Sequence, residues 1–139
     1  MVELGLDKLI IDTHPGINEE ALLAINSAHH LLVALRPDTL DYEGTGLLVQ
    51  VARKLNSPNV MLVANQAPAD NVAAVRQQLE NTFDTPVAAV IPYDGHVQEL
   101  DGVGAFVLEQ PEHAVTQAIR GILKHLTKAP VEYTRRENP

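Results

Sequence analysis

The sequence contains no cysteine, so neither a disulfide framework nor a thiolate metal site can form. Only two serines occur, Ser27 and Ser57, and neither lies in the Gly-x-Ser-x-Gly pattern of a nucleophile elbow. No apolar run approaches the roughly 18 residues that a membrane-spanning helix requires. The first residues lack a basic region ahead of an apolar stretch, which argues against a secretory signal. These absences make a cytoplasmic protein the expectation.

Basic residues are also scarce, since 10 Lys and Arg face 18 Asp and Glu and the net charge is -8. Non-specific DNA binding depends on Lys and Arg that neutralise phosphates, so the composition predicts no nucleic-acid partner. With 139 residues, 45% of them hydrophobic, the chain suits one domain with its own core. We expect this domain to span residues 1–126. The polar segment 127–139 is expected to be a flexible tail without an apolar face for a membrane.

Four short apolar runs, each followed by apolar residues at helical spacing, predict repeated strand–helix units. The runs cover residues 7–12, 30–36, 59–65 and 86–91. Strands that alternate with helices indicate a parallel sheet, so we expect a three-layer α/β domain with a mostly parallel sheet of four strands. The runs are apolar throughout, which is typical of strands buried on both faces. The predicted helices are too few to cover both faces if the strands pair in sequence order.

The segment 9–16, Leu-Ile-Ile-Asp-Thr-His-Pro-Gly, carries the strongest functional signal. Three apolar residues lead into an acid, a hydroxyl, a proline and a glycine, and Asn18 then provides a helix N-cap. An acid at the carboxyl end of a strand, beside a helix N-terminus, is where α/β proteins handle phosphate and magnesium. From the residues alone, Asp12 is either such a site residue or only the cap of a turn.

The residues 10–16 resemble the Walker B and switch II segment of the MinD/ParA family of P-loop ATPases, although His14 stands where members usually carry proline. Asn65 matches the strand-end Asn that contacts adenine in that family. The residues 91–94, Ile-Pro-Tyr-Asp, resemble the family's loop near the base. The joint order of these segments is more specific than any of them alone. The resemblance covers residues 6–126 and corresponds to the second half of the family's fold, a P-loop NTPase-like half domain.

The resemblance implies a set of nucleotide-binding residues: Asp12, Thr13, Gly16, Asn65, Pro92 and Asp94. In that set Asp12 holds magnesium through a bound water. The whole family protein binds ATP and Mg²⁺ and acts as an ATP-dependent switch in intracellular positioning or partitioning, as in cell division and chromosome or plasmid segregation. The family also implies a homodimer.

The family's phosphate loop is absent from this sequence. A phosphate loop needs Gly-x-x-x-x-Gly-Lys-Ser/Thr, and no Gly-Lys pair occurs here. We therefore expect no catalytic residue in this chain and no ATP binding by it alone, and ATPase activity is left open. The expected partners are a second copy or another protein, such as a separate half with the phosphate loop. The alternative is a catalytically inactive interaction module that binds through an exposed sheet face or edge.

The histidines raise the possibility of a zinc site. His14 and His96 both follow predicted strands, but these are the first and the fourth. At about 4.8 Å per strand the two side chains would lie roughly 14 Å apart or more. Zinc ligands lie about 2 Å from the ion, so we predict no shared metal site.

Overall fold

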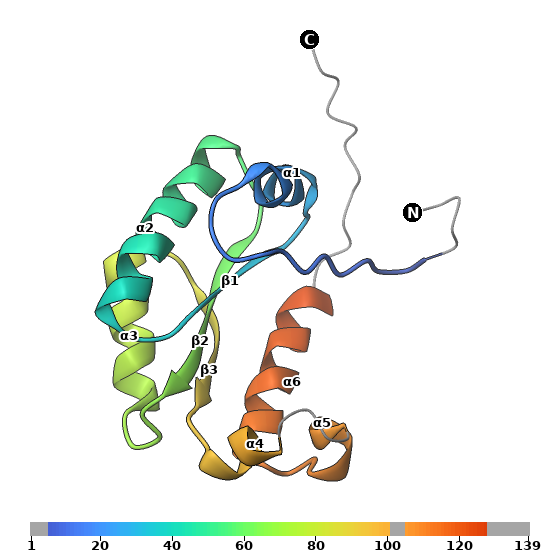
Figure 1. Cartoon of the computed structure of the whole chain (residues 1–139), viewed down its shortest axis with the longest axis vertical. Coiled ribbons are helices and arrows are strands. Elements are labelled where there is room, and N and C mark those ends of the chain that lie inside the picture. Colours follow the sequence, from blue (N-terminus) through green and yellow to red (C-terminus); the bar gives the residue numbers. More distant parts are fainter. Residues whose placement is uncertain (1–5, 101–104, 128–139) are drawn as a thin grey trace.

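A computed structural model of the protein describes residues 6–100 and 105–127, in which three parallel strands alternate with helices (Figure 1). The strands are β1 (Leu31–Leu35), β2 (Val60–Ala67) and β3 (Val87–Pro92). The helices are α1 (Glu19–Ser27), α2 (Thr39–Lys54), α3 (Val72–Phe83), α4 (Gly95–Glu99), α5 (Phe106–Glu109) and α6 (Ala114–Thr127). The predicted α/β class with a parallel sheet is confirmed. The predicted tail, apart from Thr127, lies outside the described residues.

The sheet has the order β1-β2-β3, with helices on both of its faces. Right-handed crossovers place α2 and α3 on the same face, and Figure 1 shows α6 on the other. The larger core lies between the sheet and α2 and α3, and Leu62 and Leu79 are completely buried in it. A smaller core forms around Met61 and Val63 of β2, where Ile122 of α6 packs against the other face. This second face is therefore covered over β2 and β3, while Leu32 of β1 remains exposed.

Side-chain caps explain where α1 and α2 begin. Asn18 Oδ1 accepts a hydrogen bond of 2.8 Å from Ala21 N, which confirms the predicted N-cap of α1. Asp38 Oδ1 accepts one of 3.0 Å from Asp41 N and caps α2 in the same way. These bonds satisfy N–H groups that have no partner within their own helix. Each of these two helices therefore begins at the residue directly after its capping residue.

The predicted strand over residues 7–12 is wrong, because this segment does not join the sheet. Its side chains are exposed, and Ile10 keeps 89% of its surface in contact with solvent. An apolar run becomes a strand only beside a neighbour that satisfies its backbone groups. No described strand pairs with this segment. Lys8 Nζ donates to Leu126 O at 3.5 Å, which holds the segment near the end of α6.

Candidate functional site

The carboxyl ends of β2 and β3 border a pocket of about 180 Å³. Its walls include Asn65, Pro92, Tyr93, Asp94 and Gln98. Ligands of parallel α/β sheets bind at this end of the strands, because loops there diverge and leave a crevice. We call this cavity the β2–β3 pocket. It brings together three of the six residues that the sequence predicted at a nucleotide.

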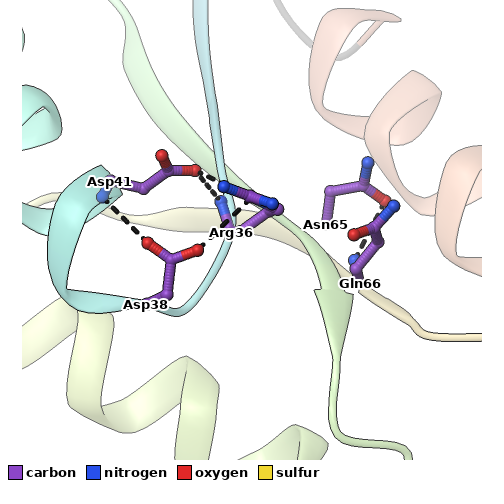
Figure 2. Close-up of polar contacts among 5 residues, drawn as sticks. All are labelled: Arg36, Asp38, Asp41, Asn65 and Gln66. Atoms are coloured by element: carbon purple, nitrogen blue, oxygen red, sulfur yellow. Dashed lines mark hydrogen bonds and ion pairs between the residues drawn. The ribbon is translucent and has the colours of Figure 1, made fainter.

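Gln66, near the end of β2, has a backbone conformation that is unusual for glutamine. Gln66 has φ of 56°, in the left-handed region that favours glycine. Asn65 Oδ1 accepts a hydrogen bond of 3.0 Å from Gln66 N, and Figure 2 shows both amide side chains projecting from the strand. This bond fixes the orientation of the Asn65 amide. Backbone strain of this kind is often found at functional sites, yet no signal in the sequence marked Gln66.

Asp94 shapes the pocket by binding other parts of the protein. Its Oδ1 caps α4 by accepting hydrogen bonds from His96 N at 2.9 Å and Val97 N at 3.1 Å. Its Oδ2 lies 3.3 Å from His113 Nε2. The Val97 N–H is the main cause that lowers the pKa of Asp94, and the backbone N–H of His96 lowers it further. The carboxylate is thus engaged within the chain, and Asp94 is one of the residues that line the pocket.

His113 is a site residue that sequence reasoning missed. Its Nδ1 accepts a hydrogen bond of 3.3 Å from Val115 N at the start of α6, and its ring meets Phe106 edge-on at 5.0 Å between centroids. A neutral imidazole has one acceptor and one donor nitrogen, so this arrangement leaves Nε2–H for Asp94. His113 therefore links Asp94, the N-cap of α4, to Val115 at the start of α6, and both of these residues line the pocket. A sequence pattern gives no sign of a pairing between two side chains so far apart.

We expect Asp94→Asn to lower the melting temperature at pH 7, because the amide keeps the shape of the cap but loses its charge. The folded pKa of Asp94 lies below its unfolded value, so its charge stabilises the fold above the unfolded pKa of about 3.9. That contribution disappears as the pH falls through the folded pKa, and the two melting curves should converge there. Asp70→Asn, at an exposed position of the β2–α3 turn, is the control. A difference that stays constant between pH 7 and pH 3 would contradict the assignment.

Asp12, Thr13 and Gly16 lie in the exposed segment before α1 and do not line the β2–β3 pocket. Because that segment is outside the sheet, its end does not meet the carboxyl ends of β2 and β3. Gly16 has φ of 100°, which agrees with a glycine-dependent turn. His14 Nδ1 faces Glu20 Oε2 at 3.4 Å, and both side chains are exposed.

The other polar cluster at this side of the sheet follows β1. Arg36 Nε lies 3.3 Å from Asp38 Oδ2 and 3.6 Å from Asp41 Oδ2 (Figure 2). A larger and more open groove of about 410 Å³ lies between Tyr42 of α2 and Asn71 at the start of α3. It contains none of the six predicted residues.

The described part of the chain has neither a cluster of metal ligands nor a membrane-spanning helix. Across residues 6–100 and 105–127, no three His, Cys, Asp or Glu side chains are grouped as metal ligands. Magnesium prefers carboxylates combined with phosphate oxygens, so Asp12 fits that ion only together with a bound nucleotide. None of the helices described is long and apolar enough to cross a bilayer.

No protein-family model matches the sequence. An uncharacterized ATP-binding protein of Methanocaldococcus jannaschii is 28% identical over 125 residues, which cover 89% of this chain and 47% of the relative. The MinD cell division protein of Aquifex aeolicus superposes with a TM-score of 0.70 at 14% identity. This chain has a MinD-like fold.

A chain of the MinC:MinD cell division protein complex of Aquifex aeolicus gives a TM-score of 0.69 at 14% identity. The two superpositions cover 86% of this chain and 52% and 51% of the MinD-like chains. This chain therefore spans about half the length of the curated relative and of the structures that it matches. The MinD-like resemblance that the motifs predicted is confirmed at the level of the fold.

Proposed function

We propose that this chain is one half of a MinD-like ATP-dependent switch and supplies the base side of its nucleotide site. The observation that carries the proposal is the β2–β3 pocket, where Asn65, Pro92 and Asp94 meet on a MinD-like fold. The description of the Methanocaldococcus relative as ATP-binding supports a nucleotide as the ligand. The whole assembly would act in intracellular positioning or partitioning.

The chemistry of the pocket suits a nucleobase. The Asn65 amide is oriented by its bond to Gln66 N and offers hydrogen bonds to a base edge. Pro92 and Tyr93 give flat, partly apolar surface for the ring. The phosphates need backbone donors and a lysine, which the half of the MinD-like fold not spanned by this chain would provide. ATP and Mg²⁺ would then bind the assembly, and this chain would contribute no catalytic residue.

The segment with Asp12 has a role only in that assembly. A partner strand beside residues 7–12 would draw the segment into a parallel sheet and bring its carboxyl end to the ligand side. Asp12 would then hold a magnesium-bound water, while Thr13 and Gly16 would form the turn at the phosphates. These three roles follow the family resemblance, and the segment that carries the three residues is exposed.

A second candidate function is a catalytically inactive interaction module. Ile10 and Ile11 are 89% and 51% exposed, and Leu32 of β1 is exposed as well. Apolar surface of this kind commonly marks a protein interface. One measurement separates the two functions. A half of an ATP-dependent switch binds ATP once the other half is present, and an inactive interaction module does not.

We expect MgATP to bind a mixture of this chain and the separately expressed part of the Methanocaldococcus relative that it does not span. In that mixture Asp12→Ala should weaken MgATP binding by about tenfold, measured by titration calorimetry. The same substitution should change the melting temperature of the chain by only a few degrees, because the Asp12 side chain is exposed. Asp70→Ala is the matched control. A complex that forms but ignores MgATP would contradict the switch and favour the interaction module.

A further inference from the structure

Among the described residues other than glycine, three have a left-handed backbone, and Gln66 differs from the other two. Asn56 has φ of 54° and Asp84 has φ of 47°, and each lies just past the end of a helix. Asparagine and aspartate adopt this conformation more readily than other residues, and helices commonly end in it. Gln66 has φ of 56° inside β2, where neither of these reasons applies. The strained backbone of Gln66 therefore needs an explanation of its own.

Gln66 lies in a bulge of the sheet. Ala64 pairs with Val90 and Ala67 pairs with Pro92, so between these pairs β2 advances by three residues while β3 advances by two. One residue of β2 is thus additional and has no partner in β3. Bulges of this kind are common beside binding sites, because the additional residue changes the direction of a side chain.

The bulge brings two neighbouring side chains to the same pocket. In a regular strand, consecutive side chains point to opposite faces of the sheet. Asn65 and Gln66 nevertheless both line the β2–β3 pocket, and Figure 2 shows their amides on the same side of β2. If only the course of the backbone mattered, glycine would adopt it without strain. The position therefore has a use for the glutamine side chain itself.

The two amides offer a ligand both donors and an acceptor. Asn65 Oδ1 accepts a hydrogen bond from Gln66 N at 3.0 Å, which leaves the Nδ2–H groups of Asn65 as donors. Within residues 6–100 and 105–127, the side-chain amide of Gln66 has no hydrogen-bond partner. The Asp94 carboxylate, by contrast, is occupied by the start of α4 and by His113. The Gln66 amide is thus available to a molecule in the pocket.

We propose that Gln66 is a specificity-determining residue of the β2–β3 pocket, and that its amide binds a flat ring on which a hydrogen-bond donor stands beside an acceptor. A glutamine amide forms two parallel hydrogen bonds with such an edge, as it can with the N6 and N7 atoms of adenine. Strained backbone at a binding site is a cost that the ligand-free fold bears. That the ring belongs to a nucleoside rests on the proposed function, whereas the use of the Gln66 amide does not.

Gln66→Gly distinguishes this role from a structural one, because it should change stability and binding in opposite directions. Glycine adopts the left-handed backbone without strain, so the melting temperature should rise by a few degrees. The loss of the amide should weaken the binding of adenosine, followed by NMR titration of the ¹⁵N-labelled chain, by about fivefold. Asp84→Gly is the control, at a left-handed residue whose side chain is fully exposed and does not line the pocket. It should not lower the melting temperature, and it should leave adenosine binding unchanged.

Two adenosine analogues identify the edge of the ring that Gln66 binds. Purine riboside lacks the 6-amino group of adenosine, and 7-deazaadenosine lacks the N7 acceptor. Each should bind the wild type about fivefold more weakly than adenosine, because one hydrogen bond is lost. For Gln66→Gly these differences should disappear, because the amide that contacts both groups is gone. Benzamide, an uncharged flat carboxamide that is not a nucleobase, is the second kind of probe.

The outcomes distinguish the role of Gln66 from the proposed function. Adenosine that binds the wild type and Gln66→Gly equally well overturns the role of Gln66 and keeps a nucleoside as the ligand. Benzamide that binds only when Gln66 is present, without any binding of adenosine, keeps the role of Gln66 and contradicts the proposed function. If neither compound binds up to its solubility limit, both proposals fail. If Gln66→Gly does not fold, equal affinities of the wild type for adenosine and its two analogues overturn the role of Gln66.

Discussion

ATP should bind this chain alone with a dissociation constant no better than the millimolar range, even with magnesium present. In P-loop proteins most of the affinity comes from backbone donors, a lysine and a Ser/Thr that holds the metal, all around the phosphates. The sequence has no Gly-Lys pair to form that cradle. Contacts from Asn65 and Pro92 to the base would give about 4 kcal/mol, which corresponds to millimolar affinity. The net charge of -8 adds repulsion of an anionic ligand.

Titration calorimetry with ATP and with adenosine measures the two dissociation constants and so tests this expectation directly. Adenosine keeps the base but carries no charge, so it should bind this chain at least as well as ATP. Asn65→Leu should abolish the residual binding of both ligands, while Leu108→Ala, at an exposed leucine that does not line the pocket, should not affect it. Micromolar binding of ATP by the wild-type chain alone would mean that the chain builds its own phosphate site. The half-switch proposal would then fail.

Local sequence patterns were sufficient to place the three strands of the sheet. The apolar runs 30–36, 59–65 and 86–91 became β1, β2 and β3, with ends that differ by one or two residues. Residues 7–12 show the same kind of run but remain an exposed segment. The difference lies outside the run, because a strand also needs a partner strand beside it, and no described strand pairs with residues 7–12. Pattern alone contains no information about that neighbour.

The pocket was predictable where it depends on topology and unpredictable where it depends on individual contacts. Asn65 and Pro92 were expected together because the carboxyl ends of parallel strands share one side of the sheet. The contact of His113 with Asp94 joins residues on different elements, and no spacing rule connects them. The left-handed φ of Gln66 was equally hidden, since glycine and asparagine are the usual signals for that conformation.

Leu62→Ala should cause the largest loss of stability of any single truncation proposed for this chain. Leu62 lies in β2, the central strand, and its side chain is fully buried in the core beneath α2 and α3. Replacement of a buried leucine by alanine removes apolar contacts and leaves a cavity, which costs about 2–5 kcal/mol. For a domain of this size that loss lowers the melting temperature by roughly 8–20 °C.

Leu108→Ala is the matched control, because Leu108 is 78% exposed and its truncation should change the free energy of unfolding by less than about 0.5 kcal/mol. Urea unfolding followed by circular dichroism gives both free energies on one scale. Equal effects of the two substitutions would mean that β2 does not form the centre of the core. A large loss at Leu62 would also weaken the β2–β3 pocket, because Asn65 and Gln66 belong to the same strand and depend on its pairing with β3.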